Sequence, residues 1–161
     1  MTDGADLDQL RTVADYQFGG GAGTALFPPE ADDTLDVRRS TGGRPRQVLL
    51  DGDRLVSYDT DGRFTLGVAG GRRLQRAFDP PRNRVVVGDE SEPFVRDGKN
   101  AFAKFVQSVD PEVRSRDEVL VVHENGDLLA VGRAELPAVG MEDFDSGVAV
   151  KVRDTVSAGE A

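Results

Sequence analysis

The chain has 161 residues, a formal net charge of −9 at pH 7, one histidine and no cysteine. This length can hold one ordinary domain or two small ones, and the lack of cysteine excludes disulfides, thiolate nucleophiles and cysteine-ligated zinc. No segment approaches the roughly 20 apolar residues that span a bilayer, and the acidic N-terminus is unlike a signal peptide, so we expect a cytoplasmic protein without a membrane partner.

The charge is unevenly distributed along the chain. Residues 1–37 carry a net charge of −7, residues 38–84 carry +6 and residues 85–161 carry −8. Aspartate outnumbers glutamate 20 to 9, and three lysines stand beside 17 arginines, a composition that we interpret as haloarchaeal. At molar salt the Debye length is about 3 Å, so an acidic surface no longer repels RNA at a distance. The acidic charge therefore does not exclude RNA, although an acidic protein with no nucleic-acid role is an alternative.

The first half of the chain changes from helical to strand periodicity. We expect, in order, a helix over 6–18, helical turns over 22–27, strands over 35–38, 47–50, 55–58 and 64–68, and a helix over 71–78. Asp-Gly pairs between the strands suit tight antiparallel turns. The pattern predicts a small α+β domain over residues 1–79, a helix on an antiparallel sheet, followed by a linker over residues 80–83.

The second half consists mainly of short β-branched runs bounded by glycine, aspartate or proline, as in a small β-barrel. We expect, in order, a strand over 84–87, a glycine-marked entry into a short helix over 101–105, a hairpin over 117–122 and 128–134, a helical turn over 139–144 and a closing strand over 147–153. The predicted barrel domain covers residues 84–155, and residues 156–161 are expected to form a disordered tail.

The order of these features resembles a PUA domain, a module of RNA-modifying proteins. The resemblance rests on the segment from Phe94 to Phe102 around Gly98 and on Val131-Gly132-Arg133-Ala134. The first half resembles the domain that precedes PUA in archaeal tRNA-guanine transglycosylases and archaeosine synthases. In those families catalysis belongs to an upstream barrel domain, which is absent from this sequence. The resemblance thus implies an RNA-binding chain with no catalytic residues, no metal and no cofactor.

The loop around Gly98 is the first candidate RNA contact. A residue without Cβ permits positive φ and lets a sugar-phosphate backbone approach the main chain. Arg96 and Lys99 could bond phosphates, Asn100 could cap the following helix or reach a base edge, and Lys104 is a further candidate. The alternative is that Gly98 only makes a turn and Lys99 is a solvated charge.

The closing strand supplies a second candidate contact. Lys151 and Arg153 are two residues apart, so both project from one face of a strand and could hold phosphates. An exposed outer face without a ligand is the alternative. Arg133 lies in the Val-Gly-Arg-Ala motif, for which we favour a structural role.

Arg72, Arg73 and Arg76 form the third candidate. Their spacing of three to four residues gives a helix one basic edge, able to bind phosphates with bidentate guanidinium groups. The alternative is a face that forms ion pairs with the chain's many aspartates.

Other motifs indicate structure rather than chemistry. The glycine run at 19–23 lacks the lysine of a phosphate loop, and the segment from Asp59 lacks the acidic residue that ends a calcium loop. Phe102 and Phe105, close to alanines on the expected short helix, are expected in the core. His123 lies late in an apolar strand, where we expect a local hydrogen bond.

These features favour a non-catalytic protein that binds tRNA or another structured RNA, as an accessory to tRNA modification in an archaeosine-like pathway. The alternative is an interaction module that docks on a tRNA-modifying enzyme without touching RNA. A standalone enzyme is disfavoured, because these residues assemble no activated nucleophile and no metal site.

Overall fold

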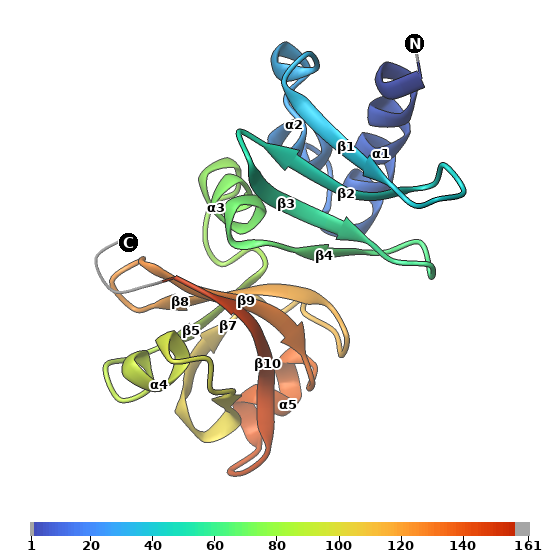
Figure 1. Ribbon diagram of the computed structural model, residues 1–161. Helices are drawn as coiled ribbons and strands as arrows, with labels where there is room; N and C mark the ends of the chain where they lie inside the picture. Colours follow the sequence, from blue (N-terminus) through green and yellow to red (C-terminus); the bar gives the residue numbers. More distant parts are fainter. Residues whose placement is uncertain (1, 157–161) are drawn as a thin grey trace. The chain divides into compact units, whose positions relative to one another are not determined.

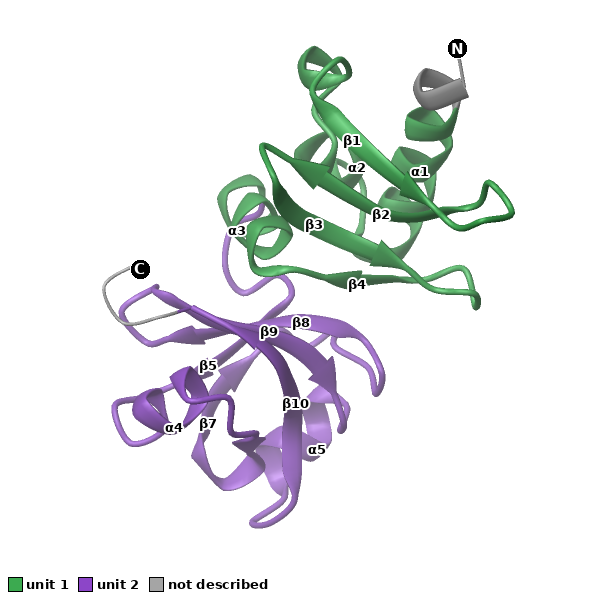
Figure 2. Cartoon of the chain, viewed as in Figure 1, with its two compact units in different colours: residues 1–77 green, residues 78–161 purple. Residues whose placement is uncertain are grey.

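The computed structural model describes residues 2–156, with side chains from Asp6 onward, and the chain divides into two compact units, residues 1–77 and 78–161 (Figures 1 and 2). No helix among the described residues is both long and apolar enough to cross a membrane. Each unit has its own sheet and its own buried core.

The first unit is a four-stranded antiparallel sheet with helices. Its elements are α1 (Thr2–Phe18), α2 (Ala22–Leu26), the 3-10 turn η1 (Pro29–Ala31), β1 (Leu35–Arg39), β2 (Pro45–Leu50), β3 (Asp53–Tyr58), β4 (Phe64–Leu66) and α3 (Val68–Ala77). The strands follow chain order in the sheet, from β1 to β4. Leu7, Leu10, Ala14 and Phe18 lie on one face of α1 because they are spaced three or four residues apart, and all four are buried.

Arg11 is the main exception to this apolar face. Its guanidinium is buried, donates a 2.6 Å hydrogen bond to the carbonyl oxygen of Phe27, and forms ion pairs with Asp8 and Asp32. A buried cation is tolerated only when its donors are satisfied. Arg11 therefore holds the segment after α2 against α1.

The second unit is built on a mixed six-stranded sheet. Its elements are β5 (Arg84–Val87), α4 (Glu92–Arg96), β6 (Ala101–Phe102), the 3-10 turn η2 (Ala103–Phe105), β7 (Val106–Val109), β8 (Glu118–His123), β9 (Leu128–Ala134), α5 (Ala138–Asp143) and β10 (Val148–Thr155). The strand order is β6-β10-β9-β8-β5-β7, and β5 and β8 are the parallel pair. The strands curve around a common core, as in a partly open barrel (Figure 1).

The core of the second unit explains the β-branched runs of the sequence. Every residue of β8 is buried, and in β9 only Arg133 is exposed, because the central strands of this sheet are covered on both faces. Val85, Val121 and Leu129 have no exposed surface and pack with Met141 of α5. The predicted α+β organisation, a helix on an antiparallel sheet followed by a mainly β barrel, is confirmed.

Residues 78–83, which include the predicted linker, begin the second unit and are held by hydrogen bonds from Arg84. The buried Arg84 guanidinium donates to the carbonyl oxygens of Phe78 and Arg82, at 2.9 and 3.0 Å, and burial lowers the pKa of this group although nearby Asp79 raises it. The Arg82 guanidinium lies 3.7 Å from the centre of the Phe78 ring. At the other end of the unit, Val156 is buried, whereas the remainder of the predicted tail lies outside the described residues.

Two expectations at the start of the second unit are wrong. The helix of this region, α4, precedes Gly98 instead of following it, and residues 101–105 form a two-residue strand and a 3-10 turn. Phe102 is not in the core, because 44% of its surface is exposed.

Candidate nucleic-acid interface

Gly98 ends helix α4. It has φ of +90°, its amide donates to the Val95 carbonyl at 3.0 Å, and the Lys99 amide donates to the Phe94 carbonyl at 2.9 Å. These two bonds define the Schellman motif, in which a glycine in the left-handed conformation closes the last turn of a helix. The glycine thus fixes the direction in which the chain leaves α4, and Lys99 is the first residue after the turn.

Asn100 joins this loop to the closing strand. Its side-chain Oδ1 accepts a 3.1 Å hydrogen bond from the Val152 amide of β10, so it neither caps a helix nor leaves this oxygen free for a base. The next residue, Ala101, pairs with Val150 of β10. The loop, β6 and β10 therefore form one connected backbone surface.

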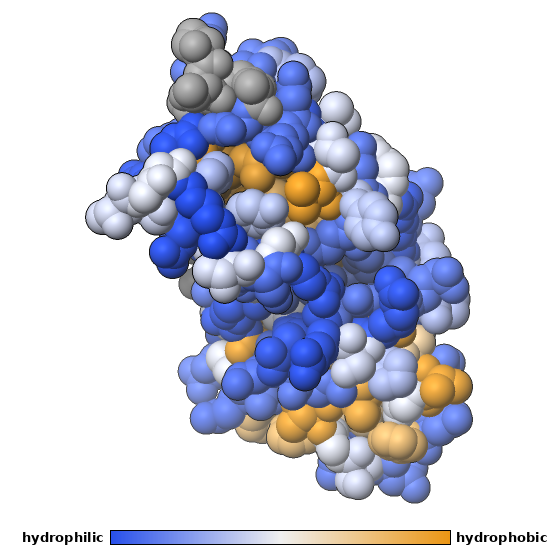
Figure 3. Space-filling view, turned by 90° about the vertical axis from the view of Figure 1, so that its right-hand side faces the viewer, coloured by the Kyte–Doolittle hydropathy of each residue, from blue (hydrophilic) through white to orange (hydrophobic). Residues whose placement is uncertain are grey.

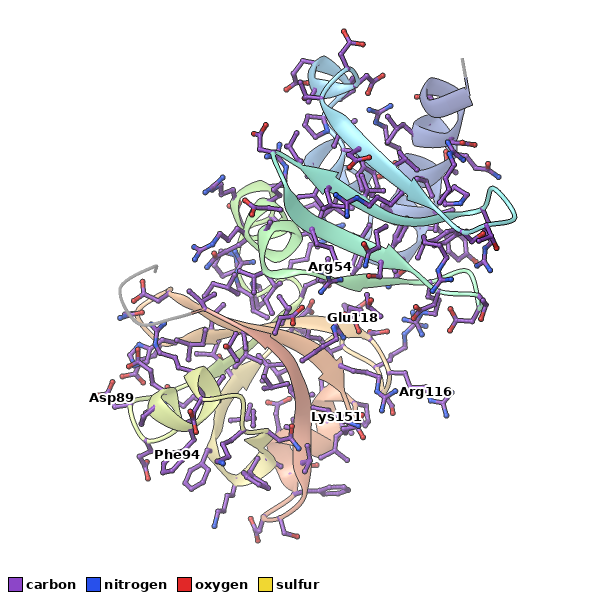
Figure 4. All side chains as sticks on the ribbon, in the orientation of Figure 1. Arg54, Asp89, Phe94, Arg116, Glu118 and Lys151 are labelled. Atoms are coloured by element: carbon purple, nitrogen blue, oxygen red, sulfur yellow. The ribbon has the colours of Figure 1, made fainter. Side chains whose placement is uncertain are left out.

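An irregularity in β10 decides which of its side chains face outward. The pairing register shifts between Val148 and Val150, and both Ala149 and Val150 are fully buried. Because two successive residues point inward, Val148 and Lys151 both face outward, as does Phe102, the partner of Val148 in β6. Figure 4 labels Lys151 on β10.

Three exposed cations surround the short strand β6. We call Lys99, Lys104 and Lys151 the lysine edge: Lys99 and Lys104 flank β6 in sequence, and Lys151 lies on the strand that pairs with it. These are all the lysines of the chain. Within residues 6–156, the nearest carboxylate oxygen to any of their ammonium groups is that of Asp97, 4.0 Å from Lys99. Lys104 also lies 5.1 Å from the centre of the Phe105 ring.

The two arginines predicted beside these lysines are engaged within the unit. Arg96 is largely buried, pairs with Glu92 at 2.9 Å and donates to the Val156 carbonyl at 3.0 Å. Arg153 forms a two-bond ion pair with Glu118, whose side chain is 4% exposed; Figure 4 labels Glu118 on β8. Contact of Arg96 or Arg153 with RNA stays a prediction, but their first role is to satisfy buried groups.

The three arginines of α3 lie in the first unit, and their helical spacing is as expected. Arg73 donates a 2.6 Å hydrogen bond to the Ala25 carbonyl, which anchors α3 to the end of α2. Arg72 is half-buried and Arg76 is exposed. They therefore do not form one uniformly exposed basic edge, and their contact with RNA stays a prediction.

In the motif at the end of β9, Gly132 has a structural role, whereas the structural role favoured for Arg133 stays a prediction. A Cβ at Gly132 would lie 2.3 Å from the Lys151 carbonyl oxygen, so a residue with a side chain would push β10 away. Arg133 pairs with Glu135 at 2.9 Å. Gly132 therefore permits the close approach that positions Lys151.

His123 makes the expected local hydrogen bonds. Its Nδ1 accepts from the Asn125 amide at 3.0 Å, so Nε2 carries the proton of the neutral ring and donates to Asp89 at 2.6 Å. The bond to Asp89 raises the pKa of His123, against an opposing effect of burial. Asp89, His123 and Glu124 bring potential ligand atoms within 4.8 Å of one another, but both ring nitrogens are already engaged, which disfavours a metal there.

Sequence reasoning missed the exposure of Phe102 and the buried partners of Arg96 and Arg153. Which side chains of β10 face outward could not be predicted without knowing that the register of this strand shifts between Val148 and Val150. Pro93 could have indicated that the helix begins before Gly98, since proline is favoured in the first turn of a helix. In the structure Pro93 lies within the first turn of α4.

Two family models match this chain, and each covers one of its two compact units. Residues 8–81 match the patch-forming domain C2 of tRNA-guanine transglycosylase, and residues 83–156 match the PUA domain. The chain therefore contains a patch-forming C2 domain followed by a PUA domain. Its pair of domains belongs to the family that forms the C-terminal regions of archaeal tRNA-guanine(15) transglycosylases.

Curated relatives are much longer than this chain. It is 46% identical over 151 residues to the tRNA-guanine(15) transglycosylase of Pyrococcus abyssi, which covers 93% of the chain and 25% of the relative. It is 46% identical over 150 residues to that of Methanothermobacter thermautotrophicus, covering 92% and 22%. The chain thus spans about a quarter of the length of these relatives.

Solved structures share the fold. A hypothetical protein of Pyrococcus horikoshii aligns with a TM-score of 0.72 at 21% identity, over 94% of this chain and 90% of its own. A conserved PUA-domain protein of Thermoplasma acidophilum aligns with a TM-score of 0.58 at 25% identity, over 78% of each chain. The fold of this chain therefore has precedents among archaeal proteins.

Proposed function

We propose that this chain is a non-catalytic RNA-binding protein that holds tRNA, or another structured RNA, on the lysine edge as an accessory to tRNA modification. The observation that carries the proposal is the location of Lys99, Lys104 and Lys151. A chain that uses arginine for most of its cations places all its lysines, exposed, around a single short strand. The relatives' role in tRNA modification supports tRNA as the RNA and an archaeosine-like pathway as its setting.

The chemistry of lysine suits contacts to the RNA backbone. An ammonium group is a compact charge on a flexible stem with three donors, and it binds phosphate without demanding a fixed geometry. Phosphate contacts position a nucleic acid rather than read its sequence. Recognition by this surface therefore rests on the shape of the RNA, and no cofactor or catalytic residue is required.

The test is equilibrium binding of the full chain to total tRNA and to tRNA that lacks its CCA end. Each variant Lys99→Gln, Lys104→Gln and Lys151→Gln is expected to weaken binding severalfold. Arg38→Gln is the matched control, because Arg38 is an exposed cation of the first unit, and we expect it to have little effect. Equal losses in all four variants would contradict a specific lysine edge, and weaker binding of truncated tRNA would locate the contact at the acceptor end.

A second candidate is a docking module for a tRNA-modifying enzyme. Val139 in helix α5 and Phe144 directly after it are 66% and 53% exposed, and the chain spans about a quarter of its relatives' length. This function is favoured if the chain binds no tRNA at any salt concentration but binds a purified tRNA-modifying enzyme, and if Val139→Ser with Phe144→Ser abolishes that binding.

A further inference from the structure

Phe102 presents an exposed aromatic ring, whereas the side chains directly before and after it in the chain are buried in the core of the second unit. Ala101 and Ala103 are 1% and 2% exposed, whereas Phe102 is 44% exposed. The ring is held in place because Phe102 pairs with Val148, and the Ala103 amide donates to the Gly147 carbonyl at 2.9 Å. The fold thus presents a ring on a fixed backbone at the edge of the sheet.

The surroundings of this ring are cationic. Lys99 precedes Phe102 by three residues, Lys104 follows it by two, and Lys151 lies on the neighbouring strand. Proteins that hold single-stranded nucleic acids combine such cations for the backbone with aromatic side chains on which bases stack. Only an unpaired base offers its face to a protein ring, because the bases of a duplex stack on each other.

We propose that Phe102 stacks against an unpaired nucleobase of the RNA that the lysine edge holds. This inference rests on the proposed function and refines it: the preferred ligand is a duplex with a single-stranded extension or an unstacked base. The three lysines contact the phosphates on either side of that base.

An exposed aromatic ring can also contact an apolar surface of a partner protein. The charges next to each ring distinguish an RNA ligand from a protein partner. Hydrophobic surface is visible over the second unit in Figure 3. Phe144 is flanked by the exposed acids Asp143 and Asp145, which repel RNA, whereas Phe102 has lysines on both sides. The acidic part of this surface suits a basic polypeptide, and the part around Phe102 suits RNA.

The test uses Phe102→Trp in the full chain, which contains no other tryptophan. The probes are a blunt RNA hairpin, the same hairpin with an unpaired 3′ adenosine extension, and that extension with abasic sites. We expect the adenosine extension to quench the fluorescence of the new tryptophan, and the other two probes to leave it almost unchanged. With the natural sequence, the extension should raise affinity about fivefold or more, as stacking of one base predicts.

Phe102→Ala and Phe102→Leu should remove the preference for the extension while leaving affinity for the blunt hairpin unchanged. Leucine keeps an apolar side chain without a ring face. Tyr16→Ala is the control, since Tyr16 is 95% exposed on the acidic helix α1, and it should keep the preference. Circular dichroism and thermal unfolding verify the fold of each variant.

The outcomes separate this inference from the proposed function. Binding of all three probes with equal affinity, without quenching and without an effect of Phe102→Ala, would overturn stacking and leave the lysine edge as a phosphate contact. Failure of the natural protein to bind any probe would overturn the proposed function, and the inference with it.

Discussion

Lys151 and Arg153 show that two cations on one strand can have different roles. Arg153 neutralises Glu118, which is almost fully buried, and removing one partner of such a pair leaves an uncompensated buried charge. Because Arg153 is itself partly exposed, we expect Arg153→Ala to lower the free energy of unfolding by about 1–3 kcal/mol. Lys151→Gln should leave stability unchanged and weaken tRNA binding. Urea denaturation and a binding titration measure both effects.

The control for the ion pair is the double variant Glu118→Leu/Arg153→Leu, which removes both charges and should recover much of the lost stability. A stable Arg153→Ala protein that has lost tRNA binding would reverse the assignment of roles. The sequence predicted the two cations but not their difference, because Glu118 lies 35 residues from Arg153 in the chain.

His123 makes the stability of the second unit depend on pH. Its pKa is raised above the ordinary value of 6.5, chiefly by the hydrogen bond to Asp89. A raised pKa means that the native state binds the proton more tightly, so this stabilisation is complete below pH 6.5 and is lost as pH rises through the native pKa. Urea unfolding of the natural protein should show this loss, and Asp89→Asn should largely remove it. An identical pH profile for the two proteins would contradict the assignment.

Gly98 determines where helix α4 ends and in which direction the chain continues. Gly98 has φ of +90°, a conformation that costs other residues roughly 1–2 kcal/mol. We expect Gly98→Ala to lower the free energy of unfolding by about that amount and to weaken tRNA binding, because Lys99 follows directly. Gly20→Ala is the matched control, since a Cβ there meets no atom within 4 Å and needs no positive φ. Equal denaturation midpoints for both variants would contradict the account.

Regular periodicity explains which elements were predictable. The helix that carries Arg73 and the strands of the first unit follow patterns of 3.6 and two residues, which local sequence displays directly. Gly98 marks a helix end, but a glycine does not reveal on which side the helix lies. The exposure of Phe102 depends on the bulge in β10, which is a property of strand pairing. Local sequence therefore predicted the helices and strands better than the directions in which their side chains point.

The acidic charge of the whole chain predicts opposite effects of salt on folding and on binding. A net charge of −9 repels itself in the compact state, and salt screens that repulsion. We therefore expect the melting temperature to rise with potassium chloride, while tRNA affinity falls because releasing counterions into a more concentrated salt solution gains less free energy. Thermal unfolding across a salt series measures the first effect. A melting temperature that falls with salt would contradict the role assigned to self-repulsion.

The order of the two domains was predictable because both halves of the sequence resemble their families in the same order, and the family matches confirm it. The ion-pair partners of buried charged residues were not predictable from the sequence. Arg11 and Asp32, for example, are 21 residues apart, and neither lies in a recognisable motif. Family resemblance thus supplied the architecture, whereas the availability of each cation became clear only from tertiary packing.

The most direct test of RNA binding by the lysine edge is the salt dependence of tRNA affinity for the natural chain and for the triple variant Lys99→Gln/Lys104→Gln/Lys151→Gln. Each phosphate contact contributes roughly 0.7–0.9 to the slope of log affinity against log salt. We predict that the triple variant binds more weakly and that its slope is shallower by about two to three. An unchanged slope and affinity in the folded triple variant would contradict the proposal that these lysines hold the RNA.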